Sequence, residues 1–302
     1  MVNHEDAARR RTARLTQHLT AAESADLGDD INVLQGSAFA TGTSDNEPSL
    51  KDQVSPEEWA LRCDLAAAYR YVAINKWDDA INNHLTVRIP GTNHFLINCF
   101  GDGFDEITAS SLVKIDVEGN VIMPGVRGDA VNRAGFVIHS CMHEGRADAH
   151  AVAHTHDPST VAVSCDKRGL LPITQTALLC GEISYHDFEG VALNDEEKVR
   201  LKADFKEEST LMILRNHGSL AIGETIAQCM TRLYFLIKAC EYQTQITGEH
   251  NNINPVANDV QTLTKTMTFA RPLPGDMIDP ICNAHFALFK RQVQRQLPGF
   301  DR

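Results

Sequence analysis

The sequence predicts an α/β fold with a central, mainly antiparallel sheet flanked by helices. Short apolar or alternating runs at 84–89, 94–98, 112–116 and 119–123 are separated by glycine and proline, which is typical of antiparallel strands joined by turns. Segments with apolar residues at helical spacing precede and follow these runs. The 302 residues, 43% of them hydrophobic, can bury one sizeable core.

The first core helix is predicted to begin at Ser55-Pro56. Ser55 can cap the helix, Pro56 takes the first helical position, and Glu58 sits where a capping box requires it. Apolar residues then recur at helical spacing as far as Trp77. Residues 1–54 are polar with little apolar periodicity, so we predict a flexible N-terminal arm there.

Helices and strands alternate in the rest of the chain, which favours the α/β class. Predicted helices cover 133–146, 157–165, 194–206 and 225–247, and predicted strands cover 150–156, 182–188 and 210–216. Asp157-Pro158 is predicted to cap the helix 157–165. We expect residues 55–250 to form the main domain. Residues 251–302 form a C-terminal extension with a terminal helix near 281–295, whose apolar side chains require burial.

Three histidines carry the strongest chemical signal. His154 and His156 stand two apart at the end of a small apolar run, and alternate residues of a strand share one face, so both imidazoles can bind one ion. His217 directly follows the apolar run 210–215 and supplies a possible third ligand. Such a site keeps open coordination positions, as catalytic metal sites do. The alternative is that two of thirteen histidines fall at this spacing by chance.

The amino-acid composition argues against some classes of binding partner. The formal charge of −12 and the pI near 5.5 argue against nucleic-acid or membrane-surface binding. No apolar run approaches the roughly 20 residues of a membrane helix, and the N-terminal residues lack the apolar core of a signal peptide. We therefore expect a cytoplasmic protein. The eight cysteines include no C-x-x-C pair, which predicts free thiols used as small core residues.

Several segments together resemble the class II aldolase/adducin family. The two most specific are Ala151-Val152-Ala153-His154-Thr155-His156 and Leu214-Arg215-Asn216-His217-Gly218, and further similar segments lie at 83–88, 95–98, 107–114, 132–139, 169–173 and 185–187. The resemblance covers about residues 57–247, and in several of these segments it is to the head domain of adducin.

The resemblance implies a fold, a cofactor and an assembly. It implies the class II aldolase type of α/β fold and a divalent metal held by His154, His156 and His217, with zinc favoured over Fe(II). It also implies a small-molecule substrate and a homotetramer, in which the C-terminal extension contributes to an interface.

The departures from the family are informative about the reaction. In the sugar-phosphate aldolases of the family a glutamate serves as acid/base, and counting back from His154 places that position at Gly135. The catalytic acid/base is therefore unknown. The positions of the phosphate pocket carry different residues, and the substrate-pocket candidates are Asn83, His84, Gly101 and Arg133. An unphosphorylated substrate is favoured.

Three functions follow from these observations. The first is a metal-dependent lyase that cleaves a C–C bond or decarboxylates a small oxo or hydroxy compound, with the ion as a Lewis acid. The second is an Fe(II)-dependent oxidative decarboxylase or oxygenase of oxo-acids. The third is a non-catalytic assembly module like the adducin head.

Overall fold

A computed structural model describes residues 34–35, 47–190, 195–246, 253–265 and 278–302. The chain divides into two compact units, Met1–Leu34 and Gln35–Arg302, and the second unit contains the predicted metal ligands. Most of the N-terminal arm predicted over 1–54 lies outside the described residues. The domain boundary predicted at residue 250 also lies outside them.

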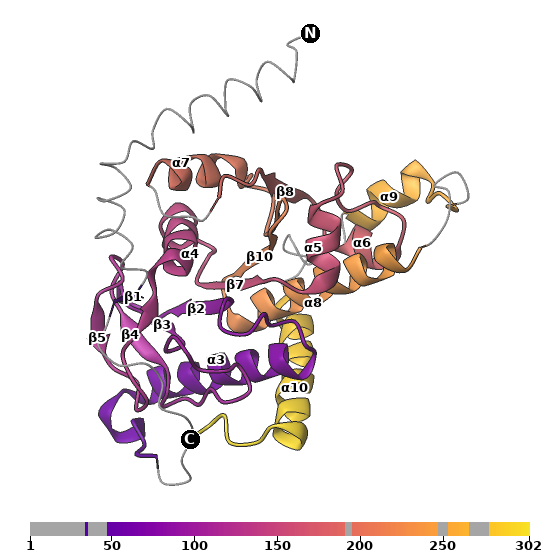
Figure 1. The fold of residues 1–302 in the computed structure, drawn as a ribbon. Helices are drawn as coiled ribbons and strands as arrows, with labels where there is room; N and C mark the ends of the chain where they lie inside the picture. Colours follow the sequence, from indigo (N-terminus) through magenta and orange to yellow (C-terminus); the bar gives the residue numbers. More distant parts are fainter. Residues whose placement is uncertain (1–33, 36–46, 191–194, 247–252, 266–277) are drawn as a thin grey trace. The chain divides into compact units, whose positions relative to one another are not determined.

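One sheet of eight strands runs through the second unit, in the order β5-β4-β3-β2-β7-β10-β9-β8 (Figure 1). Neighbouring strands are antiparallel except β8 and β9, which are parallel. The strands are β2 (His84–Arg88), β3 (Phe95–Ile97), β4 (Val113–Ile115), β5 (Val121–Met123), β7 (Ala151–Thr155), β8 (Ile183–His186), β9 (Leu211–Leu214) and β10 (Gly218–Gly223). The predicted mainly antiparallel α/β fold is confirmed.

Helices flank this sheet, and two further short strands, β1 (Leu34–Gln35) and β6 (Val131–Asn132), lie outside it. The helices are α3 (Pro56–Ile74), α4 (Arg133–Gly145), α5 (Pro158–Ser164), α6 (Gln175–Leu179), α7 (Asp195–Asp204), α8 (Ile226–Gln245), α9 (Asn258–Lys265) and α10 (Ile278–Gln296), with a 3₁₀ turn, η1, at Lys51–Gln53. Among the described helices, none has the length and apolar character needed to cross a membrane.

The predicted helix caps are present. Ser55 Oγ accepts a hydrogen bond of 3.2 Å from the backbone N–H of Glu58 at the start of α3. Asp157 caps α5 in the same way, because Oδ1 accepts from the N–H groups of Ser159 and Thr160. Asp157 thereby ends β7 and turns the chain sharply after the predicted ligand His156.

The sequence analysis missed β10 (Gly218–Gly223), whose six residues are all buried. The sequence predicts a strand over 210–216 that runs out into a turn, and no strand is predicted after that turn. The turn depends on Asn216, whose φ of 57° lies in the left-handed region that asparagine tolerates. Because β10 lies between β7 and β9, this omission concerned the centre of the sheet.

The two faces of the sheet pack against different helices (Figure 1). Ala151 and Ala153 of β7 belong to the largest apolar cluster, which includes side chains of α3, α8 and α10. Val152, between them, belongs to a second cluster with side chains of α4 and α7. His154 has the same parity as Val152, so its side chain lies on the α4 face.

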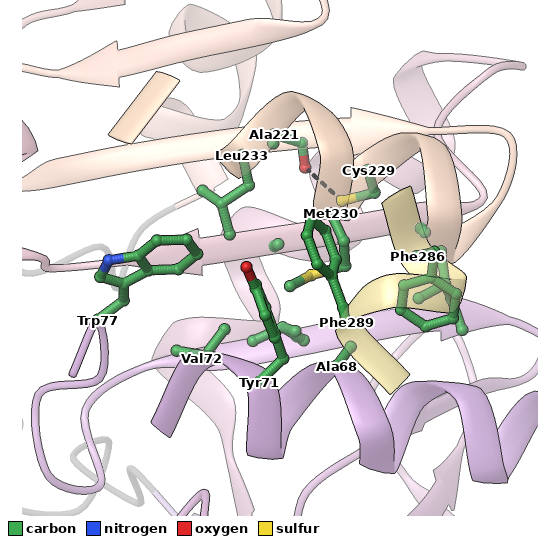
Figure 2. Close-up of a cluster of buried hydrophobic side chains, with 14 of the residues drawn as sticks. Ala68, Tyr71, Val72, Trp77, Ala221, Cys229, Met230, Leu233, Phe286 and Phe289 are labelled. Atoms are coloured by element: carbon green, nitrogen blue, oxygen red, sulfur yellow. Dashed lines mark hydrogen bonds between the residues drawn. The ribbon is translucent and has the colours of Figure 1, made fainter. Parts of the chain in front are cut away.

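Three aromatic side chains pack the C-terminal helix α10 against the largest apolar cluster (Figure 2). Tyr71 of α3 stacks on Phe289 of α10 at 4.0 Å between ring centroids, and its other neighbour is Trp77 at 5.7 Å. Phe286 is also buried, whereas Leu288 is 40% exposed. The apolar side of α10 is thus buried within the chain itself, and a subunit interface on its outer side stays a prediction.

The cysteines behave as predicted. All eight are free thiols, and six are buried in the core. Cys229 of α8 is typical, since its thiol lies 3.3 Å from the carbonyl oxygen of Ala221 on β10 (Figure 2). Burial raises the pKa of the Cys229 thiol to about 12, so this side chain acts as a small core residue.

Candidate metal centre

A strand and a hairpin bring the three predicted ligands together. β7 carries His154, and His156 follows just after its end. β10 pairs antiparallel with β7, with Ser219 opposite Thr155, so the turn before β10 carries His217 to the same place. The three ring centroids lie 4.7–4.8 Å apart, and one ring nitrogen of each lies within 4.8 Å of the others.

The close approach of the hairpin requires glycine at position 218. A Cβ atom on Gly218 would stand 2.4 Å from the carbonyl oxygen of Thr155 and 3.0 Å from the His156 ring. The first distance is shorter than any real contact of a Cβ atom with backbone. The tight turn at Asn216-His217-Gly218 therefore places His217 next to the end of β7.

Two of the imidazoles are oriented for ligation by their other nitrogens. His154 Nδ1 donates to the carbonyl oxygen of Ser219 over 3.0 Å, and His156 Nδ1 donates to Asp79 Oδ2 over 3.1 Å. Since a carbonyl and a carboxylate oxygen only accept, both Nδ1 atoms carry the proton. Both Nε2 atoms then present lone pairs, yet they stand 2.9 Å apart. A cation between such nitrogens removes this repulsion, so the donor set fits a divalent metal.

Burial keeps His154 and His217 neutral. His154 is 1% exposed, and burial, followed by the neighbouring histidines, holds its pKa well below the usual value. Burial, followed by the neighbouring His156, lowers the pKa of His217 to about 4. A neutral imidazole is the form that binds a metal, so the site is ready for an ion at neutral pH. Imidazole suits zinc and iron alike.

Asn83 holds Asp79, which is the hydrogen-bond partner of the ligand His156. Its side chain is buried, and Oδ1 accepts a hydrogen bond of 2.5 Å from the backbone N–H of Asp79. Asp79 in turn holds His156, so Asn83 acts on the metal ligand through Asp79. Its Nδ2 is buried and has no hydrogen-bond partner among the described residues. The sequence analysis missed Asp79, because its contact with His156 spans 77 positions.

His84 explains the glycine at position 135. His84 pairs with His154 across β2 and β7, and their ring centroids lie 5.1 Å apart. A Cβ atom on Gly135 would stand 2.2 Å from His84 Nε2. The space that a side chain at position 135 would enter is therefore filled by the His84 ring, which leaves no room for a carboxylate there.

Two pocket candidates are not joined to the three histidines. Gly101 is exposed in the turn after β3, with a φ of 102° that favours glycine. In the described part of the chain it makes no hydrogen bond to the ligands. Arg133 begins α4, but its side chain lies outside the described residues. Their part in substrate binding stays a prediction.

A small hollow beside His217 forms one side of the site. Its walls include Phe188, Leu214, His186 and Asp187. The Phe188 ring lies 6.2 Å from His217, centroid to centroid, and is 53% exposed. An exposed aromatic side chain at this distance offers an apolar surface to a bound molecule. The sequence analysis did not single out Phe188, since one phenylalanine in a loop carries no periodic signal.

The histidines of α4 differ from the prediction. His139 and His143 stand four apart on the predicted helix 133–146, a spacing that predicts one packed and one solvated ring, but both are buried. The ring nitrogens of His139 are hydrogen-bonded to His84 and Thr86. Those of His143 are hydrogen-bonded to Thr86 and to the carbonyl oxygen of Ala149. Full hydrogen bonding accounts for their burial, because buried polar groups are tolerated when their partners are present.

Many known proteins are similar to this chain in sequence or in fold. The family model described as Class II Aldolase and Adducin N-terminal domain matches residues 63–244. A protein of Caulobacter vibrioides, provisionally named as a class 2 aldolase, is 44% identical over 83% of this chain and 96% of its own length. The solved structure of an aldolase II superfamily protein from Pseudomonas syringae has a TM-score of 0.78, with 39% identity, and covers 84% of this chain and 100% of its own.

The chain belongs to the class II aldolase/adducin family. Alpha-adducin of Rattus norvegicus is 41% identical over 62% of this chain, a match that spans 26% of the adducin sequence. The family supports a metal-dependent lyase of the aldolase type in general terms, with a small-molecule substrate. It does not specify a reaction, and the adducin relatives keep the non-catalytic alternative open.

Proposed function

We propose that this protein is a divalent-metal-dependent lyase that acts on a small, unphosphorylated oxo or hydroxy compound by C–C cleavage or decarboxylation. The observation that carries the proposal is the convergence of His154, His156 and His217, two of them with Nε2 lone pairs held 2.9 Å apart. A catalytic centre needs three ligands and open positions, whereas an assembly module has no use for them.

The division of labour among the residues follows from their contacts. His154, His156 and His217 would hold the ion, which supplies Lewis-acid polarisation of a substrate oxygen. Ser219 and Asp79 fix the orientation of two of these rings. The exposed ring of Phe188 borders the open side, where substrate would enter.

The surroundings of the ion disfavour a phosphorylated substrate. His84 is a candidate for the substrate pocket, but burial and the neighbouring His156 and His217 lower its pKa to about 3. A neutral imidazole offers no positive charge to a phosphate. An ordinary oxo or hydroxy compound, bound through two neighbouring oxygens, suits this environment better.

The decisive experiment is the metal content of the protein, purified without added metal or chelator. The wild type is compared with the double variant His154→Ala, His217→Ala, and with His94→Ala as a control for a histidine outside the site. We expect about one ion per chain in the wild type and the control, and none in the double variant.

The identity of the metal decides between the two enzymatic functions. Zinc would direct the assay to lyase activity on oxo and hydroxy acids. Iron that consumes oxygen with an oxo-acid would support the Fe(II) oxidative decarboxylase instead. If no stoichiometric metal binds, even after anaerobic loading with Fe(II) or zinc, both enzymatic functions are wrong and the adducin-like module remains.

We also propose a homotetramer. Val260 and Leu263 of α9 and Leu288 of α10 are exposed apolar side chains, and both helices lie in the C-terminal extension that we predicted to form an interface. Light scattering on the purified protein tests the assembly. The cytoplasmic location stays a prediction.

A further inference from the structure

A chain of hydrogen bonds leads from His84 into the space between the sheet and α4. His84 Nδ1 lies 2.8 Å from His139 Nε2, and Thr86 Oγ1 lies 2.6 Å from His139 Nδ1 and 2.7 Å from His143 Nε2. The last member, His143 Nδ1, lies 2.6 Å from the carbonyl oxygen of Ala149. We call His84, His139, Thr86 and His143 the histidine chain.

The final acceptor sets the direction of every bond. A carbonyl oxygen only accepts, so His143 Nδ1 carries a proton and donates it to Ala149. A neutral His143 then has a bare Nε2, which accepts from the Thr86 hydroxyl. With its single proton used there, Thr86 accepts from His139 Nδ1.

The same logic fixes the tautomer of His84. His139 has its proton on Nδ1, so its bare Nε2 accepts from His84 Nδ1. His84 Nε2 is therefore left as a lone pair, and within the described residues it has no hydrogen-bond partner. All four members are buried, and a positive charge without a compensating partner is costly in such surroundings, so each ring is neutral and has one proton.

The position of this lone pair gives it a role in binding. The His84 ring lies 5.1 Å from the ring of the ligand His154, and the absence of a side chain at Gly135 leaves room for it. A molecule bound at the three ligands therefore lies next to an atom that accepts hydrogen bonds and cannot donate them. A hydroxyl satisfies such an atom, whereas a phosphate or carboxylate oxygen repels it.

We propose that His84 is a specificity-determining residue, held by the histidine chain as a hydrogen-bond acceptor, which selects a substrate with a hydroxyl group beside the oxygen that binds the metal. This inference rests on the proposed metal centre and narrows its substrate to α-hydroxy carbonyl compounds, either hydroxy-acids or hydroxy-ketones.

The first test is the tautomer of His84 in the metal-free protein, measured by long-range proton–nitrogen NMR on histidine labelled with nitrogen-15. We expect the proton on Nδ1 in the wild type and in Thr86→Ser, which keeps the hydroxyl. Thr86→Val has almost the same shape but breaks the chain, so His84 should become a mixture of tautomers. A proton on Nε2 in the wild type would overturn the proposal, and this result needs no variant to fold.

The second test compares two ligands with the same chelating oxygens. Glycolate carries a hydroxyl hydrogen, and methoxyacetate carries a methyl group in its place. Binding is followed through the visible absorption of cobalt(II) loaded into the site. We expect the wild type and Thr86→Ser to prefer glycolate by about tenfold, the value of one hydrogen bond, and Thr86→Val to lose most of this preference.

The outcomes separate the two proposals. An equal preference for glycolate in Thr86→Ser and Thr86→Val would overturn the role of the histidine chain. Failure of cobalt to bind the wild type would overturn the metal centre, and with it the selection of substrate by His84. The tautomer of His84, measured without metal, would still report whether the chain orients this ring.

Discussion

The two faces of β2 and β7 are both buried but have opposite characters. On one face Leu85, Val87 and Ala153 belong to the largest apolar cluster, together with side chains of α3 and α8. On the other face His84 and Thr86 lie under α4. There the ring nitrogens and the hydroxyl of the histidine chain are hydrogen-bonded to one another or to the carbonyl oxygen of Ala149, except His84 Nε2, which faces the ligands. The same two strands therefore carry a stabilising core on one side and a functional site on the other.

The comparison teaches how a polar layer can be buried without loss of the fold. An unpaired buried polar group costs about 1–3 kcal/mol, whereas a paired one costs little. The histidine chain ends on a backbone carbonyl, so its bonds are satisfied from within. The larger apolar cluster on the opposite face supplies the stability that lets the α4 face carry imidazoles and a glycine close to one another.

The largest effect on stability is expected on the apolar face. Phe289→Ala removes a ring that stacks on Tyr71 and is almost fully buried, so the free energy of unfolding should fall by about 3–5 kcal/mol. Gln294→Ala, a polar and exposed position on the same helix, should change it by less than about 0.5 kcal/mol. Urea unfolding measures both. Metal content per folded chain should stay unchanged, and a loss of metal in Phe289→Ala would show that the two faces are coupled.

A substitution at Gly135 should disturb the packing on the α4 face of the sheet and leave the opposite, apolar face intact. Alanine normally stabilises a helix relative to glycine by about 1 kcal/mol. Here the new Cβ atom would stand 2.2 Å from His84 Nε2, so we expect Gly135→Ala to destabilise the protein by about 1–3 kcal/mol and to displace the ring.

The matched control is Gly103→Ala. Its Cβ atom would stand 2.7 Å from Asp105 Oδ1, the end of a side chain that can turn away, and at an ordinary contact distance of 3.4 Å from Glu106 Oε2. We expect Gly135→Ala to lower the midpoint temperature of thermal unfolding and Gly103→Ala to leave it unchanged. An unchanged midpoint in Gly135→Ala would mean that His84 does not occupy this space.

Asp79 tests how far the functional face extends beyond the ligands. Its carboxylate accepts from His156 Nδ1, and loss of such an outer partner weakens metal affinity by about 10–100-fold. We expect this loss in Asp79→Asn, measured by competition with a chromophoric zinc chelator. Asp78→Asn changes the neighbouring carboxylate and should keep the wild-type affinity, so equal affinities in the two variants would refute the orienting role of Asp79.

Two buried histidines should give opposite dependences of stability on pH. Burial lowers the pKa of His143 from 6.5 to about 3, so its contribution is complete above about pH 6.5 and falls by about 1.4 kcal/mol per pH unit as the pH decreases toward 3. His186 differs. Burial alone would lower its pKa, but the Glu197 carboxylate, 3.9 Å away, and a hydrogen bond to Asp204 outweigh burial and raise it. Its contribution is complete below about pH 6.5 and is lost as the pH rises through the raised pKa.

Substitution of each histidine separates these contributions. We expect His143→Gln to lose less stability than the wild type between pH 7 and pH 5, and His186→Gln to lose more. Urea unfolding at a series of pH values gives the slopes. Parallel slopes for the two variants would contradict the assigned shifts.

The sequence by itself determined much of this protein. Alternation of apolar residues and the Ser55 and Asp157 caps predicted most of the elements, because these signals act over a few residues. The spacing of His154 and His156 predicted a shared face for the same reason. The glycine at position 135 was also visible, although its meaning was not.

Only the tertiary structure decided what surrounds the three ligands. The bonds of His84 to His139 and of His156 to Asp79 span 55 and 77 positions, so they depend on strand register and on the way α4 and the Asp79 turn pack on the sheet. β10 was overlooked because a short run of buried residues lacks a period that marks it as a strand. The direction of the histidine chain depends on one backbone carbonyl, that of Ala149, and a hydrogen bond to a carbonyl leaves no pattern in the amino-acid sequence.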